Sequence, residues 1–361
     1  MSNLSDFILS LITKEKEFTI DFILDCVSPE SEETQKSFVN WLREQAVNKN
    51  ESLALETKVS SAPRFVHFST IESFGDGIRM MNTFQKVGTL LFIDLEGNTK
   101  KTKDGKFSLG LKSQGGTLSC VQIGNEVTPP LIFSCDSEER KAALESNGFT
   151  SMLKESCLIF FDLRKDLAAL VTHFPTFASK NEIESLNIHD MQVWDAYLQY
   201  RRTKKIYPKN TLAGFADAVS PFLTEKAKGA FDKMKKDMKE KFQGANKANE
   251  VDWDNPGKED LQYAASDIDY LRILAFGLND EICKLSQMPV ENSDMVTRML
   301  SDDKKTNIFN NPDSVHFRRI KHMTRERLKA VIRQVNYQQA SMTVQINGYN
   351  MFDFSKFEHV S

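Results

Sequence analysis

Two carboxylates directly follow a short apolar run near residue 90 of this 361-residue chain. Residues 90–93 (Leu-Leu-Phe-Ile) are unbroken, which is typical of a strand buried on both faces of a sheet. Because side chains alternate along a strand, Asp94 and Glu96 project to the same side. Crowded carboxylates repel each other, and a divalent cation such as Mg²⁺ or Mn²⁺ removes that penalty. The pattern predicts a metal site, although a strand that simply reaches the surface could carry the same triplet.

A second pair of polar residues has helical spacing. Tyr263 and Asp267 are four residues apart, so in a helix they lie one above the other on one face. The helix is indicated by an apolar stripe made of Leu261, Ala264, Ala265, Ile268 and Leu271. Two interpretations follow: a hydrogen-bonded structural pair, or a metal ligand beside a group that orients a water.

Alternating strands and helices must position these side chains. Strands are predicted at residues 65–68, 90–96, 117–123, 131–135 and 157–161, with a short one at Ile188. Helices are predicted from Thr70, over 137–153, from about Leu163, and over 192–200 and 225–242, while 98–106 reads as a polar loop. The alternation predicts a compact α/β domain over residues 65–285.

The sequence on either side of that domain indicates two smaller modules. Residues 1–60 have the pattern of three helices and a strand, typical of a winged-helix-like unit or of a helical cap on the main domain. Residues 286–361 predict a basic helical extension. Either module could recruit a protein partner.

Composition limits the class of protein. The net charge of −3 excludes a uniformly basic nucleic-acid binder, so any such surface must be local. The five cysteines are odd in number and scattered, which favours reduced thiols in the cytoplasm or nucleus over a zinc site or disulfides. The sequence shows no signal peptide and no run that would span a membrane.

Basic residues cluster in three places. Between residues 225 and 242 lysines alternate with acids, which favours a solvated helix face over a nucleic-acid contact. Two denser clusters are the candidates for phosphate contacts: Arg201 and Arg202, then Arg318, Arg319, Lys321 and Arg325. The second cluster continues through Arg327 and Lys329 to Arg333.

Taken together, the acidic motifs resemble those of the DEDDy-type 3′–5′ exonucleases, and more narrowly the ribonuclease D-like branch with its Egalitarian-like adapters. Asp94-x-Glu96 resembles the first motif, residues 160–167 with Asp166 the second, and Tyr263 with Asp267 the third. Supporting stretches resemble the family's "Q-I", "D-T-Q" and "W-x-x-R-P" segments: Gln122-Ile123, Asp190-Met191-Gln192, and Trp253 with Pro256.

The resemblance implies a ribonuclease H-like α/β fold with a mixed central sheet and two bound ions, Mg²⁺ or Mn²⁺. It implies that Asp94 bridges the ions, that Glu96 and Asp267 complete one site, and that Asp166 holds the second. Tyr263 is then expected to orient the attacking water. The implied activity is 3′–5′ exonuclease on single-stranded nucleic acid, with RNA preferred and DNA as the alternative.

Two positions depart from the family pattern. Phe161 stands where the family commonly has His, and Asn255 where it has Arg before Pro. They keep open a catalytically silent adapter that binds RNA or a protein partner in an RNA-processing or small-RNA pathway. All four acids are present, which favours the enzyme.

Overall fold

The computed structural model describes most of the predicted α/β domain and one helix beyond it. The described residues are 65–83, 90–98, 100–101, 107–108, 117–125, 128–177, 180–183, 185–203, 212–243, 255–285 and 315–340. The predicted module at residues 1–60 and Trp253 lie outside them. Within these segments, no helix is long and apolar enough to cross a membrane.

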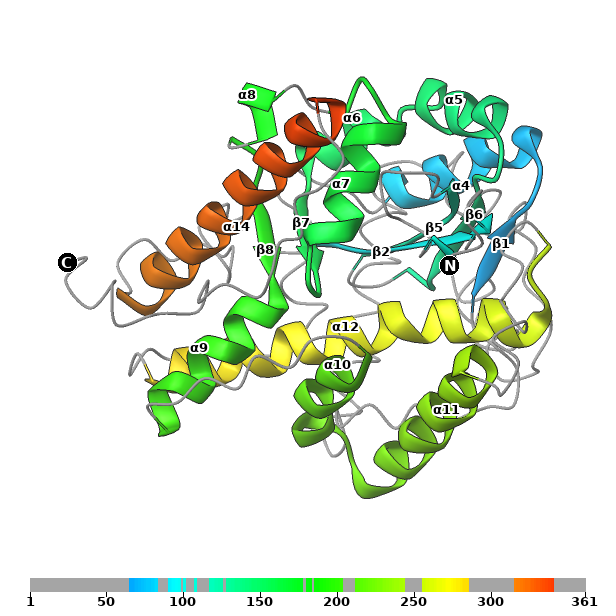
Figure 1. The fold of residues 1–361 in the computed structure, drawn as a ribbon. Coiled ribbons are helices and arrows are strands. Elements are labelled where there is room, and N and C mark those ends of the chain that lie inside the picture. Colours follow the sequence, from blue (N-terminus) through cyan, green and yellow to red (C-terminus); the bar gives the residue numbers. More distant parts are fainter. Residues whose placement is uncertain are drawn as a thin grey trace, which may run out of the picture. The chain divides into compact units, whose positions relative to one another are not determined.

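A six-stranded sheet forms the centre of the domain (Figure 1). In spatial order its strands are β1 (Val66–Phe68), β6 (Leu131–Ser134), β5 (Thr117–Gly124), β2 (Leu90–Asn98), β7 (Cys157–Phe160) and β8 (Ile188–Asp190). Strand β5 runs antiparallel to both of its neighbours, whereas the other pairings are parallel. The predicted ribonuclease H-like α/β fold with a mixed central sheet is confirmed.

The predicted polar loop at residues 98–106 is partly wrong. Two short strands, β3 (Lys100–Lys101) and β4 (Phe107–Ser108), pair antiparallel there as a separate ribbon. A pair of two-residue strands leaves too few positions for period-two alternation to be read in the sequence.

Four helices cover one face of the sheet, drawn above it in Figure 1: α4 (Ile71–Thr83), α5 (Glu138–Ser146), α6 (Phe149–Glu155) and α7 (Arg164–His173). The single helix predicted over residues 137–153 is therefore wrong, since the structure has two. Gly148 adopts a left-handed φ of 93°, a conformation that ends α5 and that glycine takes at little cost. A short helix, α8 (Lys180–Ile183), follows α7 along the chain.

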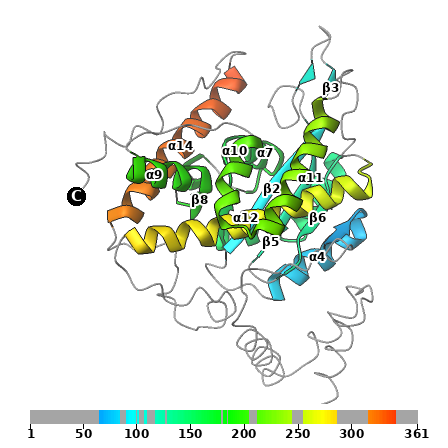
Figure 2. The same ribbon diagram turned by 90° about the horizontal axis from the view of Figure 1, so that it is seen from below.

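The long helix α12 (Lys258–Leu285) crosses the opposite face, and further helices pack beyond it (Figure 2). These are α9 (Met191–Thr203), α10 (Leu212–Val219), the 3₁₀ turn Ser220–Phe222 and α11 (Glu225–Gln243). Leu90 and Phe92 of β2 join Ile268 and Leu271 of α12 in one buried cluster. Ala264 and Ala265 are also buried, so small side chains let α12 lie close to the sheet.

Helix α14 (Val315–Ala340), from the predicted C-terminal extension, packs against α7, α9 and β8. Phe317 meets Trp194 of α9 edge-on, with ring centroids 5.4 Å apart. The prediction that the basic cluster of this helix faces phosphates is wrong for Arg327, which is only 2% exposed. Arg327 follows the buried Ile320 and Thr324 at helical spacing, so it lies on the packed face of the helix.

Candidate functional site

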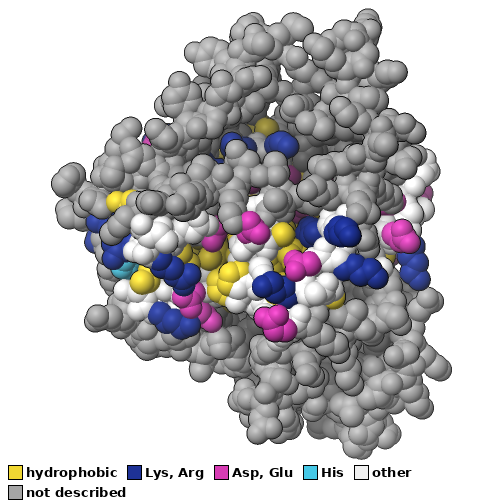
Figure 3. Space-filling model, turned by 60° about the horizontal axis from the view of Figure 1, so that its bottom comes forward, with side chains coloured by type: hydrophobic (Ala, Val, Ile, Leu, Met, Phe, Trp, Pro, Cys, Tyr) yellow, Lys and Arg dark blue, Asp and Glu magenta, His cyan; other side chains and the backbone are white. Residues whose placement is uncertain are grey.

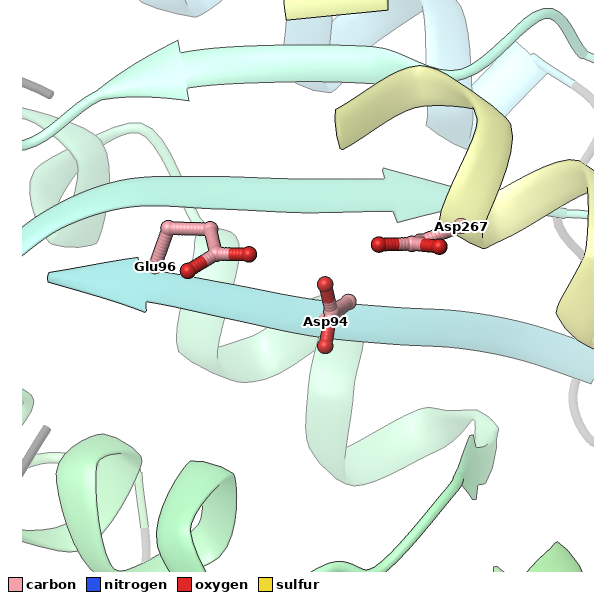
Figure 4. A group of neighbouring side chains, drawn as sticks. All are labelled: Asp94, Glu96 and Asp267. Atoms are coloured by element: carbon pink, nitrogen blue, oxygen red, sulfur yellow. The ribbon is translucent and has the colours of Figure 1, made fainter. Parts of the chain in front are cut away.

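Three carboxylates converge between β2 and α12 (Figure 4). Asp94 and Glu96 follow Phe92 on the same side of β2, the side that α12 covers, because side chains alternate along the strand. Asp267 reaches the same point from α12. One oxygen from each of the three lies within 4.8 Å of the others.

A buried amide links the two elements that carry these acids. Gln122 of β5 lies opposite Asp94 in the sheet register. In the amide orientation that satisfies its neighbours, the Gln122 NH₂ group donates to Asp94 Oδ2 at 3.0 Å and to the Ala264 carbonyl at 2.9 Å. Gln122 therefore fixes the Asp94 carboxylate relative to α12, a contact that the "Q-I" resemblance did not specify.

The local electrostatics resist full ionisation of the acids. Burial, followed by the nearby Asp267, raises the pKa of Asp94 to about 7. Burial and the charge of Asp94 raise the pKa of Glu96 well above its ordinary value. The pKa of the Tyr263 hydroxyl is also raised well above its usual range, by burial and then by Asp267. Tyr263 therefore keeps its proton at neutral pH.

Lys235 of α11 brings a positive charge into this cluster. Its Nζ donates to Asp267 Oδ1, lies 3.5 Å from the Tyr263 hydroxyl and stands 4.6 Å from the centre of that ring. The Lys235 and Asp267 side chains are only 8% and 12% exposed. The prediction of a solvated face for residues 225–242 is thus wrong at Lys235. The sequence did hold a signal, because Lys235 follows the buried Phe231 by four residues.

The donor set fits a hard divalent cation. Mg²⁺ and Mn²⁺ prefer carboxylate oxygens, and the three acids bring such oxygens within 4.8 Å of one another. A cation would also offset the mutual repulsion that raises the pKa values of Asp94 and Glu96. Lys235 Nζ already pairs with Asp267 Oδ1, so the ammonium and a metal cation would compete for the charge of this carboxylate.

Asp166 lies close to this group without belonging to it. It occupies the first turn of α7 and is 7% exposed. Burial, and then the charge of Asp94, raise the pKa of Asp166 well above its ordinary value. The two positions that depart from the family pattern lie differently: Phe161 packs on Phe215 of α10, with ring centroids 4.9 Å apart, whereas Asn255 is exposed.

The predicted phosphate contacts are dispersed over α9 and α14. Arg202 and Arg318 are exposed, but Arg202 forms an ion pair with Glu281 of α12. Arg325 is exposed as well, whereas Arg201, Arg319 and Lys321 are half-buried. On the face drawn in Figure 3, basic and acidic side chains are interleaved. The described part of that face therefore carries no surface of a single charge sign.

Comparison with known proteins gives likenesses only among solved structures. No family model and no curated protein matches the chain. The chain is similar to the Trypanosoma brucei RNase D:GMP complex at 17% identity and a TM-score of 0.44, over 74% of this chain and 64% of that one. The T. brucei RNase D complex with RNA U12 is similar at 16% identity and a TM-score of 0.43, over 74% of this chain and 70% of that one. The Aedes aegypti Nibbler EXO domain is similar at 15% identity and a TM-score of 0.40, over 66% of this chain and 96% of that one.

The fold agrees with the resemblance carried by the sequence motifs. A mixed sheet with one reversed strand brings the first motif, on β2, beside the third motif, on α12. The second motif begins α7 on the opposite face of the sheet, with Asp166 within electrostatic range of Asp94. In its fold, the chain resembles the DEDDy-type 3′–5′ exonuclease domains.

Proposed function

We propose that this protein is a metal-dependent 3′–5′ exonuclease that acts on single-stranded RNA. The observation that carries the proposal is the convergence of Asp94, Glu96 and Asp267 on one point beside the buried hydroxyl of Tyr263. Acids crowded in this way raise the free energy of the metal-free protein. A binding function for cations gives a physical reason for such an arrangement.

Each residue has a distinct role in the proposal. Asp94, Glu96 and Asp267 would hold one cation, and Asp94 and Asp166 a second. Bound Mg²⁺ or Mn²⁺ supplies stabilisation of the negative charge that develops in phosphodiester hydrolysis and lowers the pKa of water. Tyr263 remains protonated, so its hydroxyl can orient a water by hydrogen bonding without taking up its proton.

RNA is the proposed substrate because the sequence motifs most resemble the ribonuclease D-like branch. DNA is the alternative, since nothing in the described part of the chain identifies a reader of the 2′-hydroxyl group. The two are separated by offering the same sequence as RNA and as DNA.

The test uses the full chain and a 5′-labelled single-stranded oligonucleotide. We expect the RNA to shorten stepwise from its 3′ end when Mn²⁺ or Mg²⁺ is present, and to remain intact in EDTA. Asp94→Asn should abolish shortening, whereas Asp232→Asn, which removes an exposed carboxylate on α11, should not. If Asp94→Asn shortened the RNA at the wild-type rate, the proposed site would be refuted. If the DNA were digested faster than the RNA, DNA would become the proposed substrate.

One observation favours a second function, that of a silent adapter which binds RNA or a protein partner. The ammonium of Lys235 already pairs with Asp267, so part of the negative charge of the cluster is offset by the chain itself. An adapter would retain the labelled RNA, or a partner, without shortening the RNA. Its binding would be equal in Mn²⁺ and in EDTA and insensitive to Asp94→Asn.

A further inference from the structure

The turn that aims Asp166 has a strained backbone. Asp162 lies between the end of β7 and the start of α7, and its φ is 60°. This left-handed conformation is uncommon for a residue other than glycine, so neighbouring groups must hold it. Asp166 follows one helical turn later, and its direction therefore depends on the geometry of this turn.

A carboxylate from the neighbouring strand holds the turn. Asp190, the last residue of β8, is fully buried. Its Oδ1 accepts from the backbone N–H of Asp162 at 3.0 Å and of Gln192 at 3.0 Å, and its Oδ2 accepts from the N–H of Leu163 at 3.3 Å. Leu163, at the N-cap of α7, provides no side-chain cap, and Asp190 pairs the backbone N–H of this residue from the neighbouring strand.

Arg327 of α14 is the counter-charge for that carboxylate. Its guanidinium donates to Asp190 Oδ2 and to Gln192 Oε1, and it lies 3.8 Å from Asp162 Oδ1. The far side of Asp162 is held by Arg164, whose Nη2 donates to Asp162 Oδ2 at 2.6 Å. Arg327 and Asp190 are both buried, and a buried carboxylate that loses its partner is strongly destabilised.

We propose that Arg327 is a positioning residue: through Asp190 and the left-handed turn at Asp162, helix α14 fixes the direction of Asp166. The inference rests on the proposed function for the role of Asp166 as ligand of a second cation. It assigns to a helix outside the three motifs a part in assembling the site.

Two measurements test the proposal in the full chain. The first is a Mn²⁺ titration by calorimetry. In Arg327→Met the affinity for the second Mn²⁺ should fall at least tenfold, while the affinity for the first should stay within about twofold of the wild-type value. The second is amide hydrogen exchange at Asp162 and Leu163, which should be at least tenfold faster in Arg327→Met. Lys329→Met removes a half-exposed ion pair with Glu326 on the same helix and should change neither measurement.

Further variants separate positioning from general stability. The double variant Arg327→Met with Asp190→Asn has no buried carboxylate that lacks its counter-charge. It should therefore regain much of the wild-type melting temperature, while its affinity for the second Mn²⁺ stays low. Wild-type affinity for both ions in Arg327→Met would overturn the proposal, even if the variant melts earlier. Asp166→Asn tests the proposed function separately. If this variant binds Mn²⁺ as the wild type does, Asp166 is not a ligand. Faster hydrogen exchange at Asp162 in Arg327→Met would still support the role of Arg327 in holding the turn.

Discussion

Replacing Asp94 by Asn should stabilise the metal-free protein at alkaline pH, although it removes a residue placed in the proposed active site. Burial and the charge of Asp267 raise the pKa of Asp94 to about 7 in the folded protein, from an ordinary value of 3.8. Between these pH values the folded protein holds a proton that the unfolded chain has lost. The free energy of unfolding therefore falls as pH rises from about 4 to about 7.

The size of the effect follows from that shift. A difference of about 3 pKa units corresponds to about 4 kcal/mol, the full penalty once pH exceeds the folded pKa. About 3 kcal/mol of it develops between pH 5 and pH 8. The amide that Asp94→Asn introduces carries no charge, and its oxygen can still accept the hydrogen bond from Gln122. The stability advantage of Asp94→Asn over the wild type should thus grow by about 3 kcal/mol over this range.

Urea unfolding in EDTA at pH 5 and pH 8 measures this difference directly. Asp232→Asn serves as the matched control and should change the free energy of unfolding by less than ~0.5 kcal/mol at either pH. Added Mn²⁺ should stabilise the wild type more than Asp94→Asn, because the variant lacks a ligand. An Asp94→Asn protein that is less stable than the wild type at pH 8 without metal, or whose advantage is the same at both pH values, would refute the reasoning.

Three further changes probe other contacts. Lys235→Met removes the ammonium beside Asp267, so the metal-free protein should lose about 3 kcal/mol in urea unfolding; calorimetry should show tighter Mn²⁺ binding, and weaker binding would contradict the competition between the two cations. Tyr263→Phe should keep its Mn²⁺ affinity and lose ~10²-fold in single-turnover RNA cleavage, whereas an unchanged rate would remove the water-orienting role. In Gly77→Ala the new Cβ lies 2.6 Å from the Phe133 ring. The cost of overpacking, about 1–3 kcal/mol, should outweigh the gain in helix propensity, about 1 kcal/mol, so the urea midpoint should fall. A midpoint equal to or above that of the wild type would show that the ring moves aside.

The elements that carry the acids could be predicted because their signals are local. The apolar run before Asp94 and the period of two place Asp94 and Glu96 on one side of β2, as the structure has them. The stripe of α12 has a period of 3.6, which puts Tyr263 and Asp267 on one face. Their roles in catalysis remain predictions.

The break between α5 and α6 shows where local signals compete. Helical periodicity continues through residues 137–153, and the prediction followed it. Gly148 interrupts the helix with its left-handed backbone, and Asn147 before it donates from its side chain to the Ala143 carbonyl, which closes the end of α5. An Asn-Gly pair is a stop signal that outweighs periodicity at this position.

By itself, the sequence determined the strand that presents Asp94 and Glu96, the helix that presents Asp267, and their likeness to a family of exonucleases. The tertiary structure decided which basic side chains turn inward. Lys235 is 32 residues from Asp267 along the chain, and Arg327 is 137 from Asp190. Helical spacing can place a basic residue beside the apolar stripe, but it does not show whether the charge reaches back to water or meets a buried acid. The choice depends on how α11 and α14 rotate against the rest of the domain, because only that packing makes desolvation of the charge favourable.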